Sequence, residues 1–224
     1  MNEFIKVDYE VHATQFSIMK ALDKLSTKPI LSYDCETQSQ YSLEERAEAK
    51  DLLKNHIDEL TPEDRKLCKL VSKSSGLSHP KITKVTHFLF GLSEDYSVIL
   101  IAYTPTVEKL ICDWLVNYTG KLLTWNALFD LKIVYHHTGK FPVDFEDGQL
   151  LAKCLINHAD NWKSRVGLKH LMGEYYDPRW TSLDSEGYDN IDYKNKAFLR
   201  YCSIDSASTY KAWNILQEMI DETY

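Results

Sequence analysis

Two runs of β-forming residues separated by a short polar segment constrain the fold most strongly. Residues 82–103 read ITKVTHFLFGLSEDYSVILIAY, and the segment Ser93–Asp95 divides two stretches rich in Ile, Val, Phe and Tyr. Runs of this composition with turn-forming residues between them predict a β-hairpin. The chain is therefore expected to contain an antiparallel strand pair.

Predicted helices and short strands surround this hairpin. Apolar residues at helical spacing predict a helix over residues 13–26, and Ile30, Leu31 and Tyr33 indicate a strand over residues 29–37. The expected elements after the hairpin are a helix over 106–117, a strand over 121–126, helices over 128–136, 147–157 and 166–175, and a terminal helix over 193–222 with room for one break. This order predicts an α/β fold, a mixed β-sheet flanked by helices.

A charged segment lies between the first strand and the hairpin. Two helices are expected within residues 41–73, and the second has a clear start with Thr61 as cap, Pro62 in the first turn and Asp64 as a capping-box-like acid. The segment SKSSGLSHP, ending at Pro80, is expected to be a loop. Residues 38–80 are therefore predicted to form a helical insertion.

Composition limits the class of protein. The 224 residues are 44% hydrophobic and 26% charged, which suits one ordered domain over residues 1–224. The formal net charge of −7 argues against a broad surface that coats nucleic acid. It allows an enzyme that holds one strand end through metal ions.

Cysteine spacing and hydropathy bear on the compartment. The five cysteines contain no C-x-x-C pair, so neither a zinc knuckle nor a disulfide framework is expected. The N-terminus lacks the basic and apolar regions of a signal peptide, and no apolar run approaches the roughly 20 residues that span a bilayer. We expect a cytoplasmic protein without a membrane partner.

The first carboxylate motif is Asp34-Cys35-Glu36 at the end of the first predicted strand. Alternate side chains of a strand share a face, so Asp34 and Glu36 point the same way while Cys35 points to the other face. Two adjacent carboxylates repel unless a cation lies between them, and Mg²⁺ and Mn²⁺ prefer such oxygen ligands. Taken alone, the motif fits a polar strand end equally well.

Two further acids follow in helices. Asp130 falls in the first turn of a predicted helix, where the helix dipole alone would explain an acid. Tyr201 and Asp205 are four residues apart, so they share one face of the terminal helix. Each pattern taken separately also fits ordinary surface residues.

The motifs taken together resemble the DEDD 3′–5′ exonucleases with a tyrosine in the third motif. That family includes the proofreading domains of polymerase I-type DNA polymerases and ribonuclease D. The resemblance covers roughly residues 28–218 and rests on Asp34, Glu36, Asn126, Asp130, Tyr201 and Asp205, with a further likeness in the Asp147-led helix and in the segment Val166–Leu171. Asp147 is expected to be a helix cap rather than a ligand.

The resemblance implies a ribonuclease H-like fold and a cofactor of two divalent cations, Mg²⁺ or Mn²⁺. Two such ions, about 4 Å apart, activate a water and stabilise the leaving oxygen in phosphodiester hydrolysis. By the same resemblance, Asp34, Glu36 and Asp205 hold the ion that binds the attacking water. Asp34 and Asp130 hold the second ion, and Tyr201 orients the water.

Residues beside the motifs are expected to contact the substrate: Thr37, Asn126, Leu128 and Phe129. Leu128 and Phe129 would stack against terminal bases or wedge between them, and core packing is the alternative for both. Lys169 and His170 fit either a phosphate contact or a solvated helix face.

The function that the resemblance implies is removal of nucleoside monophosphates from a DNA 3′ end, preferably single-stranded. No polymerase domain follows the motifs, so we expect a free-standing exonuclease, in a bacterial or bacteriophage-infected cell, that proofreads for a separate DNA polymerase or replication protein.

A ribonuclease D-like RNA exonuclease is the first alternative, and the lack of extra helical RNA-binding domains favours DNA. The second alternative is a catalytically idle interaction subunit, against which the complete set of acids argues. The 38–80 insertion departs from the family pattern and is expected to border the substrate groove or bind a partner.

Overall fold

The structure, a computed structural model, describes residues 5–73, 82–156, 166–182 and 192–223. Most of the predicted loop ending at Pro80 lies outside these ranges. The strands are β1 (Asp8–His12), β2 (Ile30–Ser39), β3 (Thr83–Gly91), β4 (Tyr96–Ile101), β5 (Lys121–Thr124) and β6 (Phe145–Asp147). The helices are α1 (Gln15–Leu25), α2 (Leu43–Asn55), η1 (Ile57–Glu59), α3 (Pro62–Ser72), α4 (Pro105–Asn117), α5 (Ala127–Thr138), α6 (Gly148–Ile156), α8 (Leu168–Tyr175), η3 (Pro178–Ser182) and α9 (Lys196–Thr223).

The strands form one mixed sheet in the order β1-β4-β3-β2-β5-β6. β4 runs antiparallel to β3, as the predicted hairpin requires. β2 also runs antiparallel to β3, whereas β1, β5 and β6 each pair in parallel with a neighbour. The predicted fold class, a mixed sheet flanked by helices, is confirmed.

Two strands of the sheet, β1 and β6, were not expected from the sequence. β1 has only five residues, all exposed or half-exposed, and β6 has only three, so neither shows the apolar alternation that indicates a strand. Both lie at sheet edges, where pairing with a neighbouring strand decides their conformation. The terminal helix predicted over 193–222 is present as α9, which runs without a break from Lys196 to Thr223.

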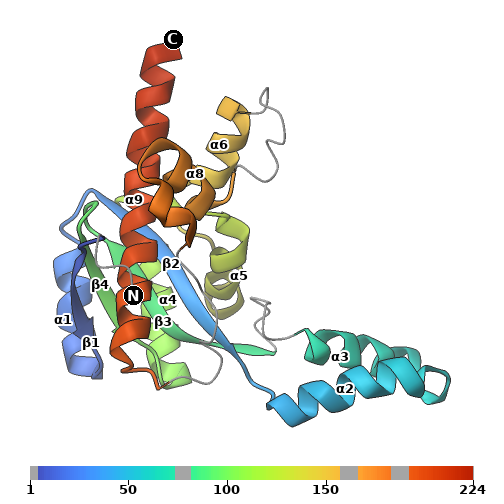
Figure 1. The fold of residues 1–224 in the computed structure, drawn as a ribbon. Coiled ribbons are helices and arrows are strands. Elements are labelled where there is room, and N and C mark those ends of the chain that lie inside the picture. Colours follow the sequence, from blue (N-terminus) through green and yellow to red (C-terminus); the bar gives the residue numbers. More distant parts are fainter. Residues whose placement is uncertain (1–4, 74–81, 157–165, 183–191, 224) are drawn as a thin grey trace.

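Helices cover both faces of the sheet (Figure 1). Successive residues of β3 point to opposite faces. Phe88 and Phe90 therefore pack with α1, α4 and α5, whereas Leu89 packs against α9. α6 and α8 pack beside α9 in a separate apolar cluster.

Small residues bring α9 close to the sheet. The Ser32 hydroxyl donates to the carbonyl of Ser206 on α9 at 2.6 Å and accepts from the backbone N–H of Gly91 at 3.0 Å. A Cβ atom at Gly91 would lie 2.7 Å from the Ser206 carbonyl oxygen, so a larger residue there would push the helix away. This contact fixes the height of α9, and therefore of Asp205, above β2.

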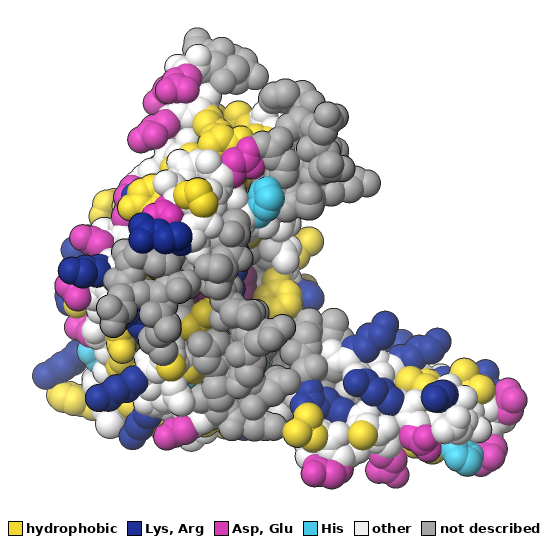
Figure 2. Space-filling model, in the orientation of Figure 1, with side chains coloured by type: hydrophobic (Ala, Val, Ile, Leu, Met, Phe, Trp, Pro, Cys, Tyr) yellow, Lys and Arg dark blue, Asp and Glu magenta, His cyan; other side chains and the backbone are white. Residues whose placement is uncertain are grey.

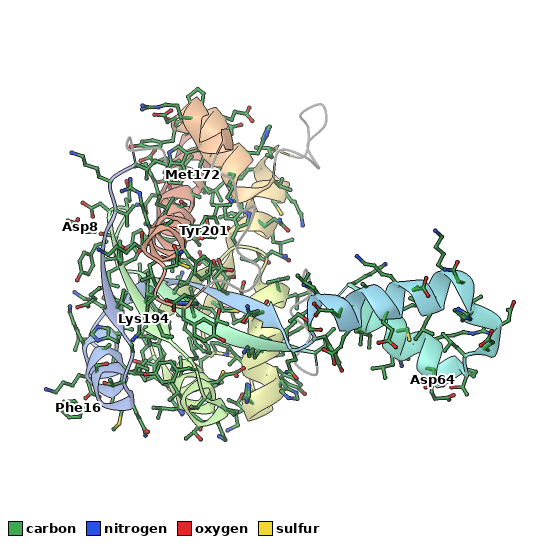
Figure 3. All side chains as sticks on the ribbon, turned by 60° about the horizontal axis from the view of Figure 1, so that its bottom comes forward. Asp8, Phe16, Asp64, Met172, Lys194 and Tyr201 are labelled. Carbon is green, nitrogen blue, oxygen red and sulfur yellow. The ribbon has the colours of Figure 1, made fainter. Side chains whose placement is uncertain are left out.

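α2, η1 and α3 form a helical arm that extends from the end of β2 away from the sheet (Figures 1 and 3). Local sequence is enough to start both helices. The Ser42 hydroxyl accepts from the N–H of Glu45, and the Thr61 hydroxyl accepts from the N–H of Asp64. Asp64, labelled in Figure 3, lies in the outer part of this arm.

Within the described ranges, no helix combines the length and the apolar character needed to span a membrane. The five cysteines are free thiols, and three of them, Cys35, Cys112 and Cys202, are buried.

Candidate metal centre

Three carboxylates converge where α9 crosses β2. Asp34 and Glu36 lie two residues apart on β2, and Asp205 approaches them from α9. One carboxylate oxygen from each of the three lies within 4.8 Å of the others. Residues that are about 170 positions apart in sequence therefore offer one group of oxygen ligands.

Asp130 reaches this group because no β5 residue pairs with β2 beside Cys35. β5 pairs with β2 only as far as Ser32, because the chain turns into α5 soon afterwards. The N–H of Cys35 instead donates to Asp130 Oδ1 at 3.2 Å, and the Cys35 thiol donates to the same oxygen at 3.2 Å. Asp130 is 1% exposed and also shares a hydrogen bond with Asp34. The four predicted acids thus lie together.

Burial and mutual repulsion perturb these acids. Burial, followed by the charge of Asp205, raises the pKa of Asp34 to about 7. Burial also raises the pKa of Glu36 and Asp130 well above the usual range, and that of Asp205 more moderately. Such a cluster holds its charge near neutral pH only when cations balance it. The donor set is entirely oxygen, which suits Mg²⁺ or Mn²⁺.

Tyr201 lies one helical turn before Asp205 and forms a side-chain hydrogen bond with its carboxylate. Its ring stacks on Phe198, with 6.3 Å between ring centroids. Burial, with the nearby charge of Asp205, raises the pKa of the Tyr201 hydroxyl well above its usual range. The hydroxyl is therefore a protonated donor beside the acids.

Lys169 supplies a positive charge to the site. Its Nζ lies 3.4 Å from the Tyr201 hydroxyl and 4.7 Å from the ring centroid. The ammonium lowers the pKa of Asp34, Glu36 and Asp205, against the larger effect of burial. The sequence left Lys169 undecided, because the pattern of α8 does not show which face meets α9.

A groove of about 460 Å³ opens beside the acids. Its lining includes Asp34 and Asp205 together with Trp125, Lys169, His170 and Thr209. The lining of the groove is mostly apolar, and its charged groups are the acids and Lys169, which could hold cations and a phosphate.

The four residues predicted to contact substrate lie around the acids in sequence and differ in exposure. Leu128 is 69% exposed, while Phe129 is partly buried with Lys132 Nζ 6.0 Å from its ring centroid. Asn126 is exposed and has a left-handed backbone with φ of 65°. Thr37 follows Glu36 at a register shift between β2 and β3. Their contacts with substrate stay predictions.

Asp147 does more than cap one helix. Its carboxylate accepts from the N–H groups of Gln149 and Leu150 in α6, as expected of a cap. It also accepts from the N–H groups of Asn126 and Ala127, both at 3.0 Å. Asp147 therefore fixes the turn that delivers Asp130, a role that no local pattern indicates across some 20 residues.

The chain was compared with known proteins. No family model and no curated protein sequence matches it. Among solved structures, Brucella melitensis NrnC matches with a TM-score of 0.56 and 13% identity, over 98% of this chain and 84% of that one. NrnC has also been solved with bound Mg²⁺ and bound to pGG.

Two ribonucleases match similarly. Escherichia coli RNase D, described as an exoribonuclease involved in structured RNA processing, has a TM-score of 0.56 and 12% identity, over 97% of this chain and 45% of that one. Trypanosoma brucei RNase D in complex with RNA U12 has a TM-score of 0.62 and 13% identity, over 95% and 63%. At these identities the likeness establishes the shared fold.

Proposed function

We propose that this protein is a two-metal-ion 3′–5′ exonuclease that acts on single-stranded nucleic acid. One observation carries the proposal: Asp34, Glu36, Asp130 and Asp205 gather into one oxygen-only cluster with Tyr201 beside it. The fold that holds this cluster is shared with NrnC and RNase D.

The four acids are the proposed metal ligands. Asp34, Glu36 and Asp205 would hold one cation, and Asp34 with Asp130 would hold the second. Bound Mg²⁺ or Mn²⁺ supplies an activated water and stabilises the leaving 3′-oxygen. The hydrogen bond from Cys35 to Asp130 keeps that carboxylate in place and turned toward Asp34.

Tyr201 and Lys169 act on the substrate side of the acids. The Tyr201 hydroxyl, held at the Asp205 carboxylate, would orient the attacking water. Lys169 Nζ lies close to that hydroxyl and in the groove, so it would bind a non-bridging oxygen of the scissile phosphate. The lysine offsets part of the charge that accumulates on the phosphate during hydrolysis.

The terminal nucleotide would lie against the start of α5. Leu128 offers an exposed apolar side chain beside the acids, and Phe129 offers a ring face. Base stacking on such residues is worth about 1–3 kcal/mol and tolerates sequence. Asn126 and Thr37 would add polar contacts to the sugar or phosphate.

DNA and RNA are the two candidate substrates. The sequence favoured DNA, whereas the nucleic acids in the two ligand-bound neighbours are pGG and RNA U12. The sugar is recognised by a local 2′-hydroxyl contact that the four acids do not make. Proofreading with a separate polymerase stays a hypothesis from the sequence resemblance.

A labelled-oligonucleotide assay tests the proposal. The protein is incubated with Mg²⁺ or Mn²⁺ and matched single-stranded DNA, single-stranded RNA and duplex DNA, each labelled at the 5′ or the 3′ end. We expect a ladder shortening from the 3′ end that Asp34→Ala abolishes and Asp113→Ala, at an exposed position on α4, leaves unchanged. Full activity in Asp34→Ala would contradict the mechanism. An inactive wild-type protein on every substrate would favour the idle interaction subunit.

A further inference from the structure

The helical arm carries its charges on separate faces. Lys50 and Lys54 are one turn apart on α2, and Lys66, Lys69 and Lys73 follow the same helical spacing along and just beyond α3. All five lysines are exposed. The arm therefore has a lysine face, which we define by these five residues.

Acids occupy a different side of the arm. Glu44 and Glu48 are one turn apart on α2 and are exposed, and Glu48 lies about a third of a turn or more away from Lys50 and Lys54. Asp51, three residues before Lys54, borders the lysine face. Figure 2 shows the result: Lys and Arg side chains gather along the upper edge of the arm, and Asp and Glu lie mainly along its lower edge. One edge of the arm is thus positively charged and the other negatively charged, although the positive and negative charges of the arm are nearly equal in number.

The two helices contribute to the same face. Ala49 on α2 and Val71 on α3 are buried in the arm. At 3.6 residues per turn, Lys50 and Lys54 lie roughly 100–140° around α2 from Ala49, while Lys66, Lys69 and Lys73 lie on the side of α3 opposite Val71. The Lys and Arg side chains of the arm gather along one edge of it (Figure 2). The lysines of α2 and α3 therefore contribute to one region of positive electrostatic potential.

These lysines keep their charge available. Lysines elsewhere in the chain form ion pairs, such as Lys24 with Glu10 and Lys109 with Asp113. Across the described ranges, no ion pair joins any of the five arm lysines to an acid. In a protein of net charge −7, an unneutralised row of five ammonium groups attracts a polyanion.

The arm is also joined directly to the metal centre. β2 carries Asp34 and Glu36, ends at Ser39, and continues into α2 at Leu43. The upper edge of the arm faces the main body across an open angle (Figure 2). A strand whose 3′ end lies at the acids can therefore leave the site alongside the lysine face.

We propose that the lysine face binds the phosphate backbone of single-stranded nucleic acid upstream of the 3′ end held at the metal centre. The proposal rests on the proposed exonuclease function for its substrate. The lysine face acts as a positioning surface: it adds affinity for long strands and takes no part in cleavage. A dinucleotide held at the acids is too short to use it.

The test compares substrates of two lengths. The variant combines Lys50→Gln, Lys54→Gln, Lys66→Gln, Lys69→Gln and Lys73→Gln, which keep helix propensity and remove the charge. Its control combines Lys6→Gln, Lys20→Gln, Lys28→Gln, Lys109→Gln and Lys140→Gln, all exposed and outside the arm. Both sets change the net charge by the same amount. Hydrolysis of a dinucleotide and of a 20-nucleotide strand is measured, with binding of the 20-nucleotide strand followed by anisotropy in Ca²⁺.

The expected loss of binding in the arm variant depends on the length of the strand and on the salt concentration. The arm variant should bind the long strand more weakly, with a higher KM, while its dinucleotide kcat/KM equals that of the wild type. Five phosphate contacts contribute a salt slope of about 3.5 on single strands, so raising salt from 50 to 200 mM should cost the wild type about 100-fold more affinity than the variant. The control set should behave as the wild type.

Failure of this proposal differs from failure of the proposed function. Equal long-strand binding and equal salt slopes for wild type and arm variant would overturn the lysine face, and would favour a protein as the partner of the arm. Loss of dinucleotide cleavage in the arm variant would also overturn it, because the lysines would then support the site itself. If the wild type cleaves nothing, the exonuclease proposal fails, and the anisotropy measurement still decides the lysine face.

Discussion

Replacing Asp34 by asparagine should stabilise the metal-free protein while abolishing hydrolysis. Asp34 has a pKa of about 7 in the folded chain, against an ordinary value of 3.8, because the partly buried carboxyl loses much of its hydration and lies beside Asp205. When the pKa of a carboxyl is higher in the folded state than in the unfolded state, the free energy of unfolding is highest below the unfolded-state pKa. It falls as the pH rises from that value through the folded-state pKa. The metal-free protein should therefore lose stability between about pH 4 and pH 7.

The magnitude follows from the same two pKa values. Their difference corresponds to about 4 kcal/mol of destabilisation at pH 8, falling to less than about half of that at pH 5. This is an upper limit, because Asp34 borders the groove and shares a proton with Asp130. A gain of about 2 kcal/mol in Asp34→Asn at pH 8 would raise Tm by about 4–8 °C for a chain of this length.

Thermal unfolding in a chelator at pH 8 and at pH 5 measures this effect. Asp34→Asn should melt above the wild type at pH 8, and by a clearly smaller margin at pH 5. Asp23→Asn, an exposed position on α1, is the control for loss of one negative charge. Added Mg²⁺ should raise the Tm of the wild type at pH 8 much more than that of Asp34→Asn. A variant that melts below the wild type in chelator at pH 8, or gains equally at both pH values, would refute the reasoning.

Three further substitutions test separate parts of the site. Tyr201→Phe should lower kcat by up to about 10²–10⁴-fold while Mg²⁺ binding by calorimetry stays near wild type, since only the hydroxyl is lost; weak metal binding would instead make Tyr201 structural. Gly91→Ala should cost about 1–3 kcal/mol in urea unfolding, because the methyl group meets the Ser206 carbonyl, whereas Gly167→Ala, which has open space, should cost far less. Asp147→Ala should cost about 1–3 kcal/mol by the same measurement, because backbone N–H groups of two elements lose their acceptor; an unchanged midpoint would show that water replaces the carboxylate.

Local periodicity accounts for the parts of the site that the sequence could indicate. Asp34 and Glu36 share a face because a strand alternates its side chains every residue, wherever that strand lies. Tyr201 and Asp205 share a face because a helix turns every 3.6 residues. The start of α3 was readable for a similar reason, since Thr61 caps the helix through a hydrogen bond to the residue three positions ahead. Ser42 caps α2 in the same way, although no helix start was predicted at that residue.

Other features depended on chain segments that meet only in the folded protein. The edge strands β1 and β6 exist because β4 and β5 offer them partners, and their own sequences carry little pattern. The acceptor at the Cys35 N–H is Asp130 because β5 ends too early to pair there. Lys169 faces the acids because α8 packs against α9, a choice that a short amphipathic pattern leaves open.

The sequence by itself determined which residues have the chemistry of a metal site and how each pair is oriented on its own strand or helix, because those relations depend on a few neighbouring residues. The tertiary structure alone decided that four acids from β2, α5 and α9 form one cluster. Bringing them together costs repulsion and desolvation, which close packing at Ser32 and Gly91 and the clamp at Asp147 offset. It also decided that the lysines of α2 and α3 lie on one face, since that depends on how the two helices pack.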